Sequence, residues 1–154
     1  MFSKIDFKYQ FLLKLMKKLW SCPKCKRKFQ KENQVHSCVE YLLAKHFENK
    51  ELAKELFEHL KREIEKSVGF LKIESLPCCI HLVSNYTFGA VWAKKDRIRI
   101  DFRTGFQIKS KRIWKMVKMS ANRYLYYLEI KDKKEIDKEL LGWIKKAYYL
   151  NKSG

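Results

Sequence analysis

Four potential metal ligands lie close together near the N-terminus. Cys22 and Cys25 are separated by two residues, and His36 and Cys38 follow after a loop of ten residues. Two sulfurs from one tight turn, joined by a second pair of nitrogen and sulfur donors, are typical of a closed tetrahedral Zn2+ site. Because protein side chains fill all four positions, we expect structural zinc with no place for a catalytic water. Two alternatives stay open: ordinary buried cysteines with a hydrogen-bonded histidine, and a Cys22–Cys25 disulfide.

The residues around these ligands resemble the N-terminal signature of a bacterial family, the domain of unknown function DUF5655. The resemblance rests on the pattern W-x-CPKC-x-R-x-F-x-x-x-NQ-x-HSC, which runs here from Trp20 to Cys38, and it continues to Tyr149. One departure is Lys26, where the family usually has glycine. The resemblance implies the fold and the metal. It implies no activity, because the role of the family is unknown.

The remainder of the sequence predicts an α+β fold. A short helix is expected over residues 39–47, starting at the metal site, with His46 as a capping or surface residue. A second helix follows, with Asn49 as its N-cap and with Leu52, Leu56, Leu60, Ile64 and Phe57 on its buried face. Gly69 ends that helix, and the hydrophobic period then changes to two. The expected strands, in a mostly antiparallel sheet, cover residues 70–73, 78–83, 87–93, 97–103, 113–117 and 123–130.

A final helix is predicted to pack on the sheet. Asp132 and Glu135 have the spacing of a capping box. The apolar face that follows consists of Ile136, Leu140, Ile144 and Ala147. We therefore expect three parts: an N-terminal extension over residues 1–15 that can form a helix, a zinc-binding knuckle over 16–38, and an α+β domain over 39–154.

Length and cysteine usage limit the class of protein. A chain of 154 residues has room for one core with a small metal-pinned head. Five cysteines in short motifs do not resemble a secreted disulfide scaffold, and a reducing cytoplasm fits them better. No apolar run approaches the ~20 residues that a membrane span needs. The expected localisation is therefore cytoplasmic, without a membrane span.

Basic residues exceed acidic ones by 18 and are unevenly distributed. Residues 94–123 carry eleven bases against two acids, and strand alternation puts Arg97, Arg99 and Arg103 on one exposed face. Such a face is typical of anion binding. The predicted nucleic-acid contacts are Lys24, Lys26, Arg27, Lys28, Arg97, Arg99, Arg103, Lys111 and Arg112, and the aromatic residues that can stack on bases if exposed are Tyr86, Trp92, Trp114, Tyr124 and Tyr126. The competing interpretation is a general lysine bias, because lysine outnumbers arginine 28 to 7.

Evidence for catalysis is weak in this sequence. No glycine-rich phosphate loop or nucleophile elbow is present. Cys78 and Cys79 are adjacent, so within a strand they are expected to point to opposite faces, and His81 has no evident third partner. We therefore predict a binding protein rather than an enzyme, with DNA or RNA as the first hypothesis. The alternative is a protein-interaction or small-ligand module with purely structural zinc; the sequence does not indicate the oligomeric state.

Overall fold

The computed structural model describes residues 19–29 and 31–152. It divides between Cys38 and Val39 into two compact units. The extension expected over residues 1–15 lies outside the described residues. Within the first unit, β1 (Trp20–Ser21) and β2 (Lys28–Phe29) pair antiparallel. Among its described residues Cys22 is the one buried side chain, so this unit has almost no apolar core.

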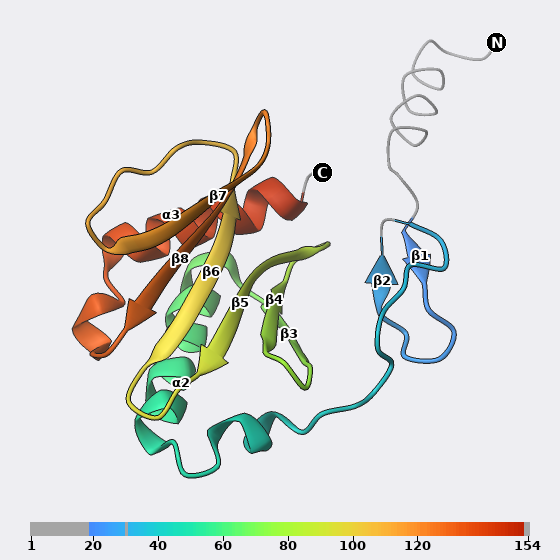
Figure 1. The fold of residues 1–154 in the computed structure, drawn as a ribbon, viewed down its shortest axis with the longest axis horizontal. Helices are drawn as coiled ribbons and strands as arrows, with labels where there is room; N and C mark the ends of the chain where they lie inside the picture. The colour runs from blue at the N-terminus through green and yellow to red at the C-terminus, as the bar shows by residue number, and fades with distance from the viewer. Residues whose placement is uncertain (1–18, 30, 153–154) are drawn as a thin grey trace, which may run out of the picture. The chain divides into compact units, whose positions relative to one another are not determined.

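The second unit is built on a six-stranded antiparallel sheet. Its strands are β3 (Lys72–Ser75), β4 (Ile80–Val83), β5 (Thr87–Ala93), β6 (Ile98–Thr104), β7 (Ile113–Ser120) and β8 (Arg123–Ile130). They lie in the order β3-β4-β5-β6-β8-β7, which leaves β3 and β7 at the two edges (Figure 1). The predicted α+β fold with an antiparallel sheet is confirmed.

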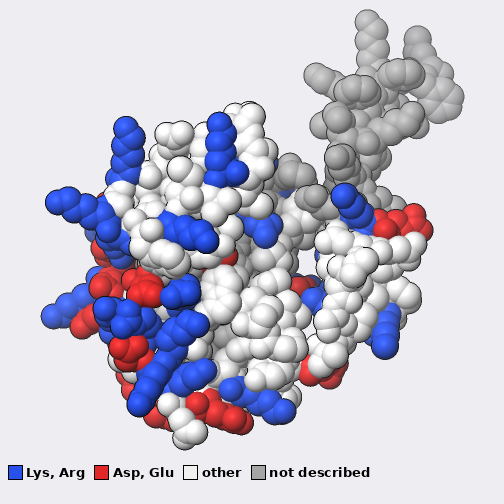
Figure 2. Space-filling model, viewed as in Figure 1, with Lys and Arg blue, Asp and Glu red and all other residues white. Residues whose placement is uncertain are grey.

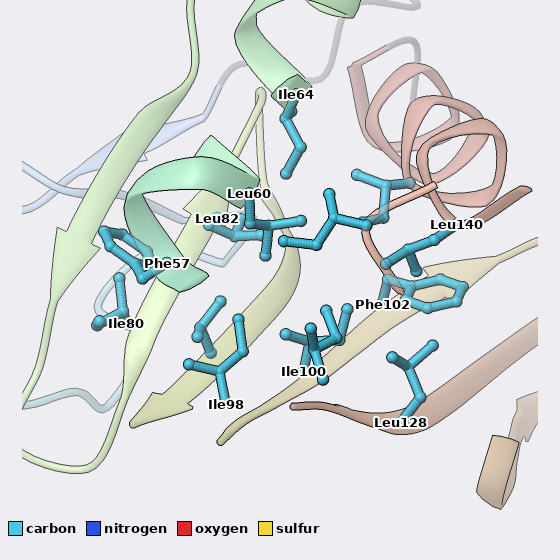
Figure 3. Packing of buried hydrophobic residues seen from close by; sticks show 14 of the residues in the cluster. Phe57, Leu60, Ile64, Ile80, Leu82, Ile98, Ile100, Phe102, Leu128 and Leu140 are labelled. Atoms are coloured by element: carbon cyan, nitrogen blue, oxygen red, sulfur yellow. The ribbon is translucent and has the colours of Figure 1, made fainter. Parts of the chain in front are cut away.

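Two helices cover one face of this sheet. They are α2 (Glu51–Val68) and α3 (Lys138–Lys152), and each follows a short 3-10 helix, η1 (Leu43–Phe47) and η2 (Lys133–Glu135). In the view of Figure 1 the strands pass in front of both helices. Figure 3 shows how Leu60, Ile64 and Leu140 from the helices meet Ile100 and Phe102 from β6. The core of the unit is this layer between helices and sheet.

Strand β6 follows the alternation expected from its sequence. Its residues are alternately buried and half-buried from Ile98 to Thr104, and Arg99, Asp101 and Arg103 lie on the face away from the helices. On β5, the residues from Phe88 to Val91 are all buried, as predicted for a central strand. A Cβ atom at Gly89 would lie 2.6 Å from the carbonyl oxygen of Asp101, so only glycine fits this close approach of two strands.

The helical predictions before the sheet need three corrections. Residues 39–42 are not helical, and the first helix begins only at Leu43. Asn49 has a left-handed backbone with φ of 57°, and Lys50 takes the N-cap position of α2. His46 is buried, not a surface residue, and lies 3.1 Å from the Ser75 hydroxyl oxygen. Burial is the main cause that lowers the pKa of His46.

The buried faces of both main helices agree with the prediction in most positions. In α2, Leu56, Phe57, Leu60 and Ile64 are buried, but Leu52 is 40% exposed and Ala53 packs in its place. In α3 the buried residues are Leu140, Ile144, Ala147 and Tyr148.

The ends of the helices show where local signals act. Gly69 ends α2 with φ of 84° and donates its N–H to the carbonyl of Glu65. The capping box of Asp132 and Glu135 exists, but it caps η2 rather than α3. Asp137 caps α3 instead, since its carboxylate accepts a hydrogen bond of 3.0 Å from the N–H of Leu140.

The face of the sheet away from the helices carries a largely buried carboxylate. Asp101 lies opposite Ala90 on β5 and Tyr127 on β8. Burial raises the pKa of Asp101 to about 6, although Arg103 and a hydrogen bond from Ala90 oppose this rise. Ionisation of Asp101 is therefore less favourable in the folded protein than in the unfolded chain.

This pKa predicts that Asp101 weakens the fold at neutral pH. The folded protein holds the Asp101 proton up to about pH 6, whereas the ordinary pKa of an aspartate is 3.8. The contribution of Asp101 to stability should therefore be fully present below pH 4, decline between pH 4 and 6, and be lower by at most about 3 kcal/mol above that range. Asp101→Asn is expected to raise the free energy of unfolding at pH 7 by about 1–3 kcal/mol, with no gain at pH 4, as measured by urea unfolding.

Asp96→Asn is the matched control. The Asp96 carboxylate is exposed and pairs with Arg97, whose hydrogen bond lowers the pKa of Asp96. Its neutralisation should give no gain at pH 7. A loss of stability in Asp101→Asn at pH 7 would contradict the prediction.

Candidate metal centre

The side chains of Cys22, Cys25, His36 and Cys38 converge at one point of the first unit. Their ligand atoms all lie within 4.8 Å of one another. The Sγ atoms of Cys22 and Cys38 are 3.8 Å apart, and Nε2 of His36 is 3.3 Å from the Sγ atoms of Cys25 and Cys38. The four residues that the sequence marked as ligands are thus brought together, and they can hold a metal ion.

The turn after β1 presents the first two sulfurs. Lys26 donates its N–H to the carbonyl of Cys22 at 2.8 Å, and the N–H of Cys22 reaches the carbonyl of Arg27 at 2.9 Å. These bonds curl the chain between Cys22 and Cys25 into a knuckle. The turn closes with φ of 63° at Lys26, a left-handed backbone that glycine adopts more easily than lysine.

A second layer of contacts fixes His36. Its Nδ1 lies 2.6 Å from the carbonyl oxygen of Gln34, so the ring turns Nε2 toward the sulfurs. The ring of Phe29 packs against the imidazole with centroids 4.2 Å apart, and Trp20 lies 5.9 Å from Phe29. A backbone carbonyl that orients a histidine in this way is typical of metal sites.

Hydrogen bonds prepare the first pair of thiols for ionisation. The backbone N–H of Cys25 is the main cause that lowers the pKa of Cys22. Burial raises the pKa of Cys25, but hydrogen bonds from the backbone and side chain of Arg27 outweigh it and lower the value to about 6. Burial raises the pKa of Cys38, and the bond to Gln34 raises that of His36. A metal ion binds these four side chains best once the thiols and the imidazole have lost their remaining protons.

The basic residues of this unit differ in their surroundings. Lys24, Lys26 and Lys28 are exposed. Arg27, in contrast, donates to the carbonyl of Ser37 and lies 5.7 Å from the centroid of the Phe29 ring. Arg27 therefore joins the knuckle to the second ligand pair.

The arginines predicted on the sheet face have partners within the protein. Glu129 accepts from Arg97 at 2.6 Å and from Arg99 at 3.1 Å, and Asp96 also pairs with Arg97. Arg103 donates to the carbonyl of Thr87 at 3.1 Å. The arginines do lie on one face, but acids neutralise part of their charge.

Beyond the sheet centre, the basic residues continue to alternate with acids. Arg112 lies 3.0 Å from Asp137 and 3.4 Å from Glu139, and it also donates to the carbonyl of Glu135. Lys111 is exposed. Figure 2 shows Lys and Arg side chains interspersed with Asp and Glu on the visible face.

A row of aromatic side chains crosses the face of the sheet that α2 and α3 leave uncovered. The ring centroid of Tyr127 lies 6.4 Å from Trp92 and 5.7 Å from Trp114. Of the aromatic residues expected to stack on bases, Trp92 and Trp114 belong to this row, whereas Tyr124 and Tyr126 are buried on the helix side. Tyr127 was missed, although the alternation of β8 puts it on the face opposite to Tyr126.

Of the two adjacent cysteines, Cys79 is buried and Cys78 is exposed, but neither lies within strand β4. The Sγ atoms of Cys78 and Cys79 are 3.0 Å apart, because both residues precede β4 and do not alternate as strand residues do. Burial raises the pKa of Cys79 to about 12. A thiol held in its neutral form is a poor nucleophile.

Most of the second unit matches a known protein family. The model of a domain of unknown function (DUF5655) matches residues 43–151, which cover most of the second unit. The chain belongs to this family. The DUF5655 match begins after the four ligands, so the metal group lies outside the matched residues. No curated protein and no solved structure matches this DUF5655 chain. Within its described residues, no helix has the length and apolar character needed to cross a membrane.

The strained turn at Lys26 gives a test of the metal group. Lys26→Gly should relieve the left-handed backbone, with a gain of at most about 1 kcal/mol. Because folding of the knuckle and metal binding are coupled, we expect metal affinity to rise by up to about fivefold, as measured by competition with a chelating dye.

Lys24→Gly is the control, since it removes the same charge from the same loop at a residue outside the left-handed region. It should lower the affinity. Equal effects of the two substitutions would show that charge, not backbone conformation, decides the result.

Proposed function

We propose that this protein is a binding protein whose first unit is held together by structural Zn2+ and whose sheet contacts single-stranded nucleic acid. The two parts of the proposal rest on different observations. The metal is supported by the donor set of the first unit. The nucleic-acid contact is supported by the aromatic row on the uncovered sheet face.

The four donors suit zinc in number, chemistry and spacing. A tetrahedron with zinc–sulfur bonds of about 2.3 Å has sulfur–sulfur edges of about 3.8 Å. The distance between the Sγ atoms of Cys22 and Cys38 is 3.8 Å. Three thiols and one imidazole leave no coordination position open, which favours a structural role. A unit with one buried side chain among its described residues also needs such a staple.

The zinc proposal predicts one equivalent of metal per chain. Elemental analysis of protein purified without a histidine tag is the measurement, and Cys38→Ser should lower the content below about half an equivalent. Cys78→Ser, which changes an exposed thiol in the second unit, should leave it unchanged. Less than half an equivalent in the unaltered protein would refute a structural site.

Metal removal should affect the two units differently. The apolar cluster of the second unit consists entirely of its own residues, from Phe47 to Tyr148. Chelation is therefore expected to unfold the first unit and to leave the main thermal transition in place. Amide hydrogen exchange separates these effects, since only residues 19–38 should lose protection.

The aromatic row supports the nucleic-acid contact. Trp92, Tyr127 and Trp114 come from three different strands, β5, β8 and β7, and Trp114 is 52% exposed. Two cations lie over these rings: the guanidinium of Arg99 is 4.9 Å from the centroid of Trp114, and Nζ of Lys115 is 5.3 Å from that of Tyr127. Rings that stack on bases beside cations that reach phosphates are the common equipment of single-strand binding surfaces.

The nine predicted basic contacts are not equal candidates for phosphate binding. Arg97 and Arg112 each face two carboxylates, so a phosphate has to compete with these acids. Lys24, Lys26 and Lys28 in the first unit are exposed, as is Lys111 in the second. We assign phosphate contact first to these four lysines. The five unpaired cysteines support a reducing, cytoplasmic setting for such binding.

Trp114 is the residue that tests the stacking contact. Trp114→Ala should weaken binding of a labelled single-stranded polypyrimidine about fivefold or more, as measured by fluorescence polarisation at low salt. Binding should also decline steeply as salt increases. Phe70→Ala is the control, because Phe70 is 79% exposed and lies outside the row.

Two results would refute the contact. One is the absence of binding at low salt. The other is an equal loss of affinity in the Trp114 and Phe70 variants, which would show that any exposed aromatic side chain has the same effect.

A further inference from the structure

Strand β7 is an exposed edge of the sheet. It pairs with β8 on one side, and no strand among the described residues pairs with its other side. Every residue from Trp114 to Ser120 is exposed. Met116 and Val117 are exposed by 49% and 37%, and their apolar side chains lie on opposite faces of the sheet. Proteins usually protect such an edge, because its backbone groups can pair with a further strand.

The middle of β7 has a regular pattern of side chains. Its pairing with β8 is irregular between Ile113 and Lys115 and again between Lys118 and Ser120. The four residues between these irregularities are Lys115, Met116, Val117 and Lys118. Lys115 and Val117 lie on the uncovered face, opposite Tyr127 and Leu125, and the other two lie on the helix side. Each face therefore presents one cation and one apolar side chain.

We propose that β7 binds an extended peptide segment whose sequence places an acid, two apolar residues and a second acid opposite these four positions. The backbone of the segment continues the sheet, and its carboxylates pair with Lys115 and Lys118. Cross-strand pairs of opposite charge stabilise a sheet, and apolar pairs opposite Met116 and Val117 add to them. The four-residue pattern reads the same in either direction, so it suits a parallel or an antiparallel partner.

A second copy of the chain fits this edge poorly. An antiparallel self-pairing centred between Met116 and Val117 places Lys115 directly opposite Lys118 twice, which is destabilising. Centring the pair on Met116 places Lys115 opposite Val117 and Lys118 opposite Trp114. Neither register offers a carboxylate to the lysines, and both chains carry a formal net charge of +18. Charge complementarity therefore favours an acidic partner.

The edge and the aromatic row meet at Trp114 and Lys115, but Lys118 belongs to the edge alone. Lys118 lies opposite Tyr124, which is buried on the helix side, whereas the row lies on the uncovered face. A Lys118→Glu variant therefore changes the edge and leaves the aromatic row in place. Nucleic-acid binding should survive in this variant even where peptide binding is lost.

The test uses the full chain and short labelled peptides. One peptide contains the run valine, glutamate, valine, valine, glutamate, valine; the second has lysine in place of both glutamates, and the third is the first with N-methylated backbone amides on one edge. We expect the unaltered protein to bind the first peptide alone. Hydrogen exchange of the β7 amides should slow in that complex.

A charge exchange makes the test decisive. In Lys115→Glu with Lys118→Glu, binding of the glutamate peptide should fall about tenfold or more, and the lysine peptide should now bind. Exchanging Lys94 and Lys95 for glutamate, in the exposed turn before β6, is the matched control and should change the affinity for neither peptide. The proposal is overturned if the unaltered protein does not bind the glutamate peptide, if the N-methylated peptide binds equally, or if sedimentation shows a dimer that Met116→Lys dissociates.

Discussion

The apolar layer between one face of the sheet and helices α2 and α3 is the interaction on which the second unit depends. Leu56, Leu60, Ile64, Leu140 and Ile144 have no other place to be buried, and they meet the inward residues of β5, β6 and β8. Two helices cover only one face of six strands. The opposite face and the edge strand β7 must therefore combine apolar and charged side chains without a helix of this unit over them, and the proposed binding surfaces lie there.

In the zinc proposal, the first unit is stabilised by metal coordination in place of apolar burial. Two short strands cannot bury enough apolar surface to fix a loop. The ligand group supplies the missing restraint, because four donors from two ends of the loop must meet at one point before a metal binds. The contacts of Arg27 and Phe29 then serve the geometry of the ligands: one bridges to Ser37, and the other packs on His36. Under the zinc proposal, metal binding and folding of this unit are one event.

Spacing predicted most of what is local, and tertiary contacts decided the rest. The ligand set, the end of α2 at Gly69 and the alternation of β6 follow from residue types at fixed intervals. The burial of His46 does not follow from such intervals, since His46 contacts Ser75, which lies far along the chain. The predicted cap of α3 was wrong for a related reason, because two aspartates lie near its start. Asp132 caps η2, and only the three-dimensional path of the chain makes Asp137 the cap of α3. The sequence also did not reveal which strand lies at the edge. Strand β7 lies between β6 and β8 in the sequence, but in the sheet β8 pairs with β6 and β7 is outermost.

The role of the basic residues shows most clearly why composition is an incomplete guide. Arginine has a planar group that pairs well with carboxylates, and for that reason it finds acids within its own protein. Arg97 and Arg99 share Glu129, and Arg112 holds Asp137 near the start of α3. These arginines tie strands and helix together, and little of their charge remains for a partner. Lysine, in contrast, keeps its charge at the end of a flexible and hydrated stem. The excess charge that reaches solvent is thus carried by residues such as Lys115 and Lys118, on the edge strand that still has a side open for pairing.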